Sequence, residues 1–372
     1  MTGPRFTPLV ENLPASVPFV GPETQERRLG RTFAARLGAN ESVFGPSPKA
    51  IEAMAQAARD TWMYGDPEAH DLRAAIAAHH GVTPQHVMPG EGIDGLLGLL
   101  VRLTVGPGDA VVTSDGAYPT FNFHVVGFGG QLHKVPYRDD REDPEALIAR
   151  AEDLRPKLIY FANPDNPMAS HHPAPVVHAM VEAVPEGSLL ILDEAYIDLA
   201  PEGTAPRIDA DDPRVIRMRT FSKGYGLAGL RVGYALGAPA LIASFDKVRN
   251  HFGLGRIAQA GALAALADQA WLAHVRAEVV TARNRIAEIA RANGLHPLPS
   301  ATNFVTVDCG RDGAFARAVL AGLIARGVFV RMPGVAPMDR CIRISCGTAA
   351  DLDLLAAQLP AALEEARAIT QS

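Results

Sequence analysis

The chain has 372 residues, of which 48% are hydrophobic, so it can bury a large core. A net charge of only −6 excludes an intrinsically disordered chain, and the excess of 41 acidic over 35 basic residues argues against a dedicated nucleic-acid-binding protein. Three cysteines, an odd and small number for this length, argue against a disulfide framework, and the lack of a C-x-x-C pair argues against a zinc site. Because neither a signal peptide nor a membrane span is recognisable, we expect a cytoplasmic protein.

Residues 1–48 are irregular and rich in Pro and Gly, and such an arm is typically disordered or laid across another surface. A large domain follows at 45–250, where helical patterns alternate with short apolar runs bounded by turn residues. Helices are predicted from Pro48, at 67–80 with Asp66 as N-cap, and at 94–104, 144–151 and 174–183. Strands are predicted at 110–114, 132–136, 158–162, 189–193, 215–220 and 232–236. Such apolar strands are typical of a mostly parallel sheet sandwiched by helices, which indicates an α/β domain.

Residues 251–372 predict a smaller α+β domain. An Ala-rich helical pattern covers 257–293, with room for one break, and Asn293-Gly294 is its expected stop. Strands are predicted at 304–307, 328–331 and 341–345, and helices at 313–326 and 349–369. We expect the N-terminal arm, residues 1–44, to join this small domain.

A lysine follows the predicted strand 215–220, in the turn Ser222-Lys223-Gly224. Taken alone, Lys223 reads as a solvent-exposed loop residue. The alternative is a Schiff-base lysine, whose amine must be desolvated to be nucleophilic near neutral pH.

Two further strand ends carry polar groups. Asp193 ends an apolar run, and is either a turn acid or a carboxylate that keeps a heteroaromatic nitrogen protonated. Asn166, in Asn-Pro-Asp-Asn-Pro, is either part of a rigid turn or a hydrogen-bond donor to a cofactor oxygen. In open α/β sheets, ligands bind outside the carboxyl ends of the strands, which is where these residues stand.

Groups that could bind an anion occur at three other places. Gly92, before the helix 94–104, lets backbone N–H groups approach an anion, although glycine turns before helices are common. Arg231, eight residues past Lys223, is either exposed or a phosphate clamp. Arg343, flanked by apolar residues in a strand, either faces the surface or clamps a substrate carboxylate.

Each feature alone is weak, but their order is specific. Asn166 is followed 27 residues later by Asp193 in Asp-Glu-x-Tyr, then 30 residues later by Lys223, and then by Arg231 and Arg343. With this order the sequence resembles the fold type I pyridoxal-phosphate (PLP) aminotransferases, and within them the histidinol-phosphate aminotransferase branch. The resemblance also includes segments 37–41, 45–48 and 64–67, so it covers nearly the whole chain.

The resemblance implies a PLP site. Lys223 would form the Schiff base with PLP and shuttle a proton during the reaction, and Asp193 would pair with the protonated pyridine nitrogen. The other implied contacts are Tyr196 and Asn166 at the ring's phenolic oxygen, Tyr118 stacked on the ring, and Gly92, Ile93, Ser222 and Arg231 at the phosphate.

The resemblance also implies a homodimer, because Tyr64 in this family reaches the phosphate of the other subunit. Arg343 would hold the substrate's carboxylate, or the phosphate that replaces it in an amino-alcohol phosphate, and Asn40 and Arg331 would lie near the substrate. The implied reaction moves an amino group between an L-amino acid, or an amino-alcohol phosphate such as histidinol phosphate, and a 2-oxo acid.

The substrate half departs from the family pattern. Met168-Ala169-Ser170 replaces the usual Thr-Gly, and Phe19 stands where histidinol-phosphate enzymes often carry a tyrosine. Arg256, before the long helix, is either a surface residue or a group that recognises an anionic substrate end. The sequence therefore leaves the amino donor open. The alternative reaction is that of a PLP-dependent decarboxylase of the threonine-phosphate decarboxylase type, and the alternative class is a non-catalytic PLP-binding protein.

Overall fold

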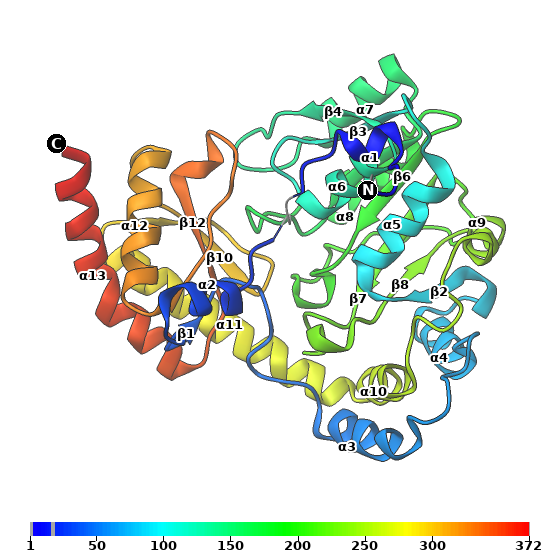
Figure 1. Cartoon of the computed structure of the whole chain (residues 1–372), viewed down its shortest axis with the longest axis horizontal. Coiled ribbons are helices and arrows are strands. Elements are labelled where there is room, and N and C mark those ends of the chain that lie inside the picture. The colour runs from blue at the N-terminus through cyan, green and yellow to red at the C-terminus, as the bar shows by residue number, and fades with distance from the viewer. Residues whose placement is uncertain (1–2, 16–18, 372) are drawn as a thin grey trace.

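The computed structural model describes residues 3–15 and 19–371, which form a larger and a smaller part joined by one long helix (Figure 1). The larger part is built on a seven-stranded sheet with the order β2-β8-β7-β6-β5-β3-β4. In this sheet β8 runs antiparallel to β2 and β7, and the other pairings are parallel. The prediction of an α/β fold with a mostly parallel sheet is confirmed.

The strands of the large sheet follow the apolar runs of the sequence. They are β2 (Val87–Gly90), β3 (Ala110–Ser114), β4 (Gln131–Val135), β5 (Leu158–Ala162), β6 (Leu189–Asp193), β7 (Val215–Thr220) and β8 (Gly233–Leu236). Six of them were expected, with bounds that agree to within one residue. The exception is β2, which is short and contains Pro89, a residue that normally argues against a strand.

Helices cover both faces of this sheet (Figure 1). The helices of the larger part are α3 (Pro48–Ala57), α4 (His70–His80), α5 (Gly92–Thr104), α6 (Pro119–Gly127), α7 (Pro144–Leu154), α8 (Ala174–Glu182), α9 (Pro239–Ser244) and α10 (Arg256–Ala267), of which α3 lies further out and packs on α10. The predicted start of α4 is wrong. The Asp66 carboxylate accepts the N–H groups of Glu68 and His70, but Ala69 takes a left-handed φ of +47°, so the helix begins one turn late.

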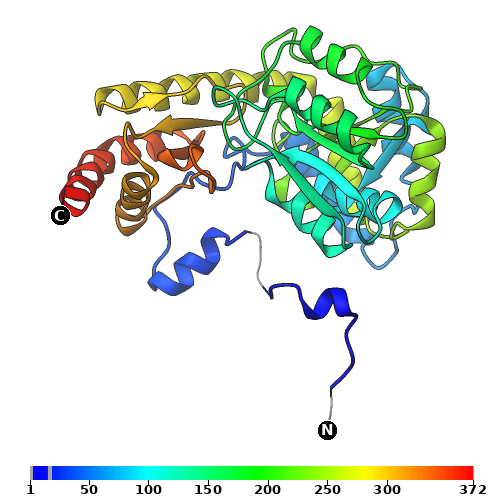
Figure 2. The same ribbon diagram turned by 90° about the horizontal axis from the view of Figure 1, so that it is seen from above.

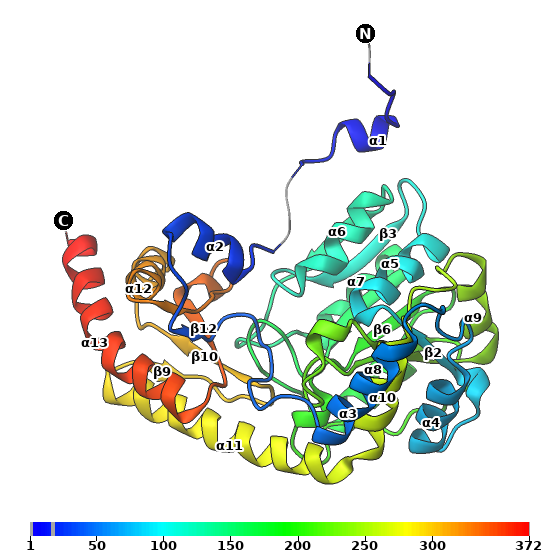
Figure 3. The same ribbon diagram turned by 60° about the horizontal axis from the view of Figure 1, so that its bottom comes forward.

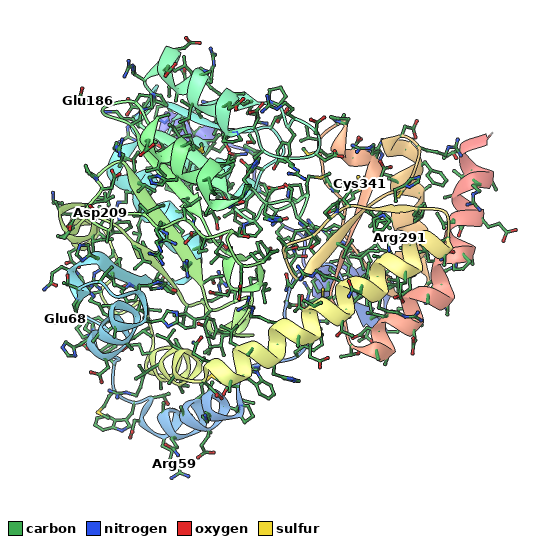
Figure 4. The ribbon with its side chains drawn as sticks, turned by 180° about the vertical axis from the view of Figure 1, so that it is seen from behind. Arg59, Glu68, Glu186, Asp209, Arg291 and Cys341 are labelled. Carbon is green, nitrogen blue, oxygen red and sulfur yellow. The ribbon has the colours of Figure 1, made fainter. Side chains whose placement is uncertain are left out.

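The smaller part has a three-stranded antiparallel sheet with the order β12-β10-β9. Its strands are β9 (His296–Pro297), β10 (Phe304–Asp308) and β12 (Cys341–Ser345), and its helices are α11 (Gln269–Ala292), α12 (Gly313–Ala325) and α13 (Ala349–Gln371). Figure 4 marks Cys341 here, on β12. The arm pairs with this part, because β1 (Ala35–Arg36) runs parallel to β11 (Val328–Phe329).

The arm is more ordered than its sequence suggests. It contains the helices α1 (Pro8–Glu11) and α2 (Pro22–Leu29). Ion pairs from Arg36 to Glu23 (2.8 Å) and Glu26 (2.6 Å) tie α2 to β1. By contrast, α1 stands away from the rest of the chain (Figures 2 and 3).

The long Ala-rich pattern is broken once, as expected, between α10 and α11. The break is at Asp268, whose carboxylate accepts hydrogen bonds from Ser47 Oγ (2.5 Å) and Lys49 Nζ (3.1 Å). Residues of α10 pack in a core of the larger part together with Leu272, whereas the buried residues of α11 from Val275 onward pack in the core of the smaller part. Figures 1 and 3 show α11 running between the two. The domain boundaries at 44 and 250 stay predictions.

Within the described ranges, no helix combines the length and the apolar character that crossing a membrane requires. Across the same ranges, no group of three His, Cys, Asp or Glu side chains is placed to hold a metal ion. All three cysteines are buried free thiols.

Candidate active site

Lys223 lies just beyond β7, at the edge of the sheet where the parallel strands end. Its Nζ donates a hydrogen bond to the Asn40 carbonyl (3.0 Å) and lies 5.6 Å from the centre of the Tyr196 ring. Burial, and after it the nearby guanidinium of Arg343, lowers the pKa of the Lys223 amine to about 8. A partly buried amine of this kind has the reactivity that a Schiff-base lysine needs.

Asp193 ends β6, the strand beside β7, and is 5% exposed. The Tyr160 hydroxyl donates to its Oδ2 (2.6 Å), and the backbone N–H of Ala195 donates to its Oδ1 (2.9 Å). Burial raises the pKa of Asp193 to about 6, and these two hydrogen bonds oppose the rise. The carboxylate is therefore held in one orientation and is mostly ionised at neutral pH.

Glu194, the next residue, is fully buried and holds β6 to β7. It accepts hydrogen bonds from Arg217 Nη2 (2.9 Å) and Arg219 Nε (2.7 Å). Burial opposes the ionisation of Glu194, but the two guanidinium groups outweigh it and lower the pKa of this carboxyl to about 2. Because Glu194 directly follows Asp193 and Arg219 lies four residues before Lys223, this ion group ties β6 to β7 near both strand ends.

The arm contributes Asn40, which is 2% exposed and has a φ of +55°. Its Nδ2 donates to the Tyr196 hydroxyl (3.1 Å), and its Oδ1 accepts from Ser345 Oγ (2.9 Å). Its carbonyl accepts from Asn303 Nδ2 (3.0 Å) as well as from Lys223. One arm residue thus connects the larger part, the smaller part and the lysine.

Arg343 on β12 faces inward rather than toward the surface, and its role as a clamp for a substrate carboxylate stays a prediction. Its Nη1 donates to Asn166 Oδ1 and its Nη2 to the Gly38 carbonyl (3.3 Å), while its guanidinium lies 5.2 Å from the centre of the Phe304 ring. Its buried Nε has no hydrogen-bond partner among the described residues. Burial lowers the pKa of Arg343 to about 10.

Arg331 lies opposite Arg343 in an antiparallel bridge. Its Nη1 donates to the Val20 carbonyl (2.9 Å), and its guanidinium lies 4.4 Å from the centre of the Phe19 ring. Within residues 3–15 and 19–371, neither arginine forms an ion pair with a carboxylate. Two neighbouring guanidinium groups without an acidic partner favour the binding of an anionic ligand between them.

The start of α5 forms a cradle for an anion. Gly92 has a φ of +75°, a conformation that residues with a Cβ rarely adopt, and a Cβ atom there would also displace the mobile Nη2 of Arg231, 2.6 Å away. Asp94 holds the surrounding groups, because it accepts a hydrogen bond from the Tyr118 hydroxyl (2.8 Å) and pairs with Arg231 Nη2 (3.4 Å). Free N–H groups at the start of a helix favour a phosphate at this place.

A second glycine brings the lysine turn beside this cradle. Gly233 on β8 pairs with Thr220, and a Cβ atom on Gly233 would lie 3.0 Å from both the Gly92 carbonyl carbon and the Ile93 nitrogen. The Thr220 hydroxyl donates to Ser222 Oγ (2.9 Å), two residues further along the chain. The predicted phosphate residues Gly92, Ile93, Ser222 and Arg231 therefore lie at one place.

Tyr64 and Arg256 are not part of this cluster. The Tyr64 side chain is 77% exposed and lies 4.6 Å from the Phe252 ring, and Arg256 Nη2 donates to the Tyr64 carbonyl (2.9 Å). Both residues line a separate hollow of about 430 Å³. In the described part of the chain, neither residue contacts Lys223 through a hydrogen bond, an ion pair or a ring contact.

Sequence reasoning does not single out four residues that shape the site, namely Tyr160, Asp94, Asn303 and Ser345. Asp94 stands in the segment Gly90–Asp94 that the sequence already marks, so its position was a usable signal. Tyr160 reads as one more apolar residue of a buried strand. Asn303 and Ser345 belong to the smaller part, and only the folded chain brings them to Asn40.

The sequence profile of the family "Aminotransferase class I and II" matches residues 35–359. A histidinol-phosphate aminotransferase from Moorella thermoacetica is 33% identical over 351 residues, which cover 93% of this chain and 90% of that protein. Its counterpart from an Anaeromyxobacter species is 36% identical over 354 residues, which cover 92% of this chain and 95% of that one.

Solved structures agree with these relatives. The crystal structure of histidinol-phosphate aminotransferase from Sinorhizobium meliloti in complex with pyridoxal-5′-phosphate has a TM-score of 0.95 and 55% identity, with 98% of each chain covered. An aspartate aminotransferase from Thermus thermophilus with maleate shares the fold, with a TM-score of 0.81 and 24% identity over 98% of this chain and 100% of that one. These relatives do not favour the decarboxylase alternative. The chain belongs to the class I and II aminotransferases, which use PLP to move an amino group between an amino donor and a 2-oxo acid.

Proposed function

We propose that the amino donor of this aminotransferase is an amino-alcohol phosphate, with histidinol phosphate as the first candidate. The proposal rests on the arginines at 331 and 343, which lie opposite each other in a backbone bridge and have no carboxylate partner among the described residues. It is supported by the similar histidinol-phosphate aminotransferases, above all the one from Sinorhizobium meliloti that is 55% identical. Of the departures from the family pattern, Phe19 packs against the guanidinium of Arg331 (4.4 Å), whereas 168–170 have no hydrogen bond to either arginine among the described residues.

The residues at the strand ends fit PLP. The desolvated amine suits an aldehyde, and the ionised carboxylate suits a pyridinium nitrogen. The glycine-lined helix start with its arginine suits a phosphate. The buried, unpartnered Nε of Arg343 adds a donor that is free to bind a ligand.

When bound, PLP supplies an aldehyde that captures the amino group and a ring that accepts the electrons released when the Cα–H bond breaks. We assign to Lys223 the capture of the aldehyde and the movement of a proton to and from Cα. Asp193 holds the proton on the ring nitrogen. Tyr196 and Asn166 donate to the phenolic oxygen, and Tyr118 packs on the ring.

The remaining assignments concern binding. Gly92, Ile93, Ser222 and Arg231 hold the cofactor phosphate. Arg343 and Arg331 hold the anionic end of the donor, and Asn40 closes the site from the arm. Correct placement of reacting groups contributes as much to such a reaction as any single charge.

We further propose a homodimer in which Tyr64 reaches the cofactor phosphate of the other subunit. Its support is the exposure of Tyr64, which lies away from the lysine of its own protomer, next to the exposed side chain of Phe252. Arg256, which is hydrogen-bonded to the Tyr64 carbonyl, would lie near the substrate of that second site. We also propose a cytoplasmic location, in keeping with three free thiols.

A half-reaction screen tests the donor. The visible absorbance of the PLP-loaded protein is followed while histidinol phosphate, histidinol, or an aromatic or acidic amino acid is added alone. We expect histidinol phosphate to bleach the band much faster than histidinol, and a 2-oxo acid to restore it. Equal rates for histidinol phosphate and histidinol would contradict the arginine-pair argument. A band that only aromatic donors bleach would replace the proposed substrate class.

A further inference from the structure

Tyr160 occupies the centre of β5, directly beneath the carboxyl edge of the sheet. Its side chain is fully buried and stacks on Phe121, with ring centres 4.6 Å apart and planes 16° apart. Phe121 lies on α6, three residues after Tyr118. Because the ring is fixed on both the strand and the helix side, the hydroxyl has one position available.

That position is at the Asp193 carboxylate. The Tyr160 hydroxyl donates to Asp193 Oδ2 over 2.6 Å, and in the described part of the chain this is its only recorded hydrogen bond. The Ala195 N–H occupies Oδ1. Two donors on different oxygens prevent the carboxylate from rotating, and each oxygen keeps a lone pair for another donor.

The surroundings of Asp193 otherwise oppose its ionisation. Burial raises its pKa most, and the carboxylates of Asp94 and Glu194 raise it further. The hydrogen bond from Tyr160 is the largest of the effects that lower it. Tyr160 itself stays protonated, because burial and the Asp193 charge hold its own pKa well above the usual value. It is therefore a donor over the whole working pH range.

We propose that Tyr160 is a positioning residue for the reaction, which aims the Asp193 carboxylate at the ring nitrogen of PLP and keeps it ionised to hold that nitrogen's proton. The inference rests on the proposed role of Asp193. It adds a residue that touches neither the substrate nor the cofactor and acts only through Asp193.

The test is Tyr160→Phe in the full chain, measured as cofactor affinity rather than activity. Apoprotein is titrated from pH 5.5 to 8.5 with PLP, and separately with an analogue in which a C–H group replaces the ring nitrogen. Tyr234→Phe is the matched control, since that tyrosine is equally buried and its hydroxyl bonds to His80 Nε2 (2.9 Å) instead.

In Tyr160→Phe we expect PLP affinity at pH 7 to fall by about tenfold or more, because a hydrogen bond to a charged group is lost. The loss should shrink toward pH 8.5, where Asp193 is ionised even without Tyr160. Affinity for the analogue should stay within about twofold at every pH, since the analogue has no nitrogen proton to hold. Tyr234→Phe should bind both ligands like the wild type.

Two results would overturn the proposal: unchanged PLP affinity in Tyr160→Phe, or an equal loss for PLP and for the analogue, which would mark a merely structural role. If the wild type does not prefer PLP over the analogue, the assignment of Asp193 fails instead. Should Tyr160→Phe not fold, 3-fluorotyrosine at position 160 gives a second test. As a stronger donor of the same size, it should extend tight PLP binding to lower pH, and a shift to higher pH would refute the proposal.

Discussion

The reactivity of Lys223 can be predicted from its surroundings. An ordinary lysine with a pKa near 10.5 is neutral in roughly one molecule in 3,000 at pH 7. With a pKa of about 8, roughly one Lys223 in ten is neutral at that pH. Only the neutral amine attacks an aldehyde, so burial and Arg343 together raise the reactive fraction by about 300-fold.

Stopped-flow measurement of PLP capture by the full-length apoprotein tests this value. Between pH 6 and 8 the rate should rise by about tenfold per pH unit, and above pH 8 it should level off. In Arg343→Met the midpoint of this pH dependence, which reports the pKa of Lys223, should move to higher pH, because a cation that disfavours the charged lysine is gone. Arg291→Met, which removes an exposed arginine at the far end of α11, is the control and should keep the midpoint of the wild type.

A midpoint near 10 in the wild type would refute the desolvation argument. A midpoint that does not move in Arg343→Met would show that Arg343 does not lower the pKa of Lys223.

Three further predictions concern the cradle, the buried ion group and the arginine pair. Gly92→Val should weaken PLP binding at least about tenfold, because a β-branched residue is strained at a φ of +75° and would displace Arg231, and equilibrium titration that finds normal affinity would contradict the cradle. Glu194→Gln should lower the free energy of unfolding in urea by roughly 3–5 kcal/mol, since the nearly buried Arg217 loses its carboxylate partner and Arg219 keeps only Asp198 at 3.8 Å. The contribution of Glu194 to stability in the wild type should be complete above its unfolded pKa of about 4.5 and be lost as the pH falls toward 2, so the Gln variant should show a weaker acid dependence. Arg331→Met should raise the KM for histidinol phosphate with little change for an unphosphorylated donor, and a fall in kcat alone would argue against a binding role.

Much of the site could be predicted because of where its residues stand in the sheet. Asn166, Asp193 and Lys223 each follow a buried parallel strand, and parallel strands end at one edge, so their meeting follows from topology. The approach of Arg331 to Arg343 could not be predicted, because it depends on an isolated bridge between two short segments. The role of Tyr160 could not be predicted for a different reason. An aromatic residue within an apolar run looks like core, and only its hydroxyl partner reveals a second role.

The boundaries of helices are also only partly predictable from local composition. Asp66-Pro67 has the composition of a helix start, and Asp66 does cap backbone N–H groups, yet the left-handed Ala69 delays the helix by a turn. Local composition identifies the capping residue, whereas the first helical residue is set by how the chain enters the packed core.

The helix α11 has a mechanical consequence. Its 24 residues extend about 36 Å at 1.5 Å per residue, from the break at Asp268 to the core of the smaller part. Since Ser47 and Lys49 hold Asp268, this end can serve as a pivot. A rotation of about 5° there would move the far end by about 3 Å, by the same helix geometry. The arginines of the smaller part would travel with that helix while Lys223 stays on the large sheet, so a tilt of α11 would change the distance between these arginines and the lysine.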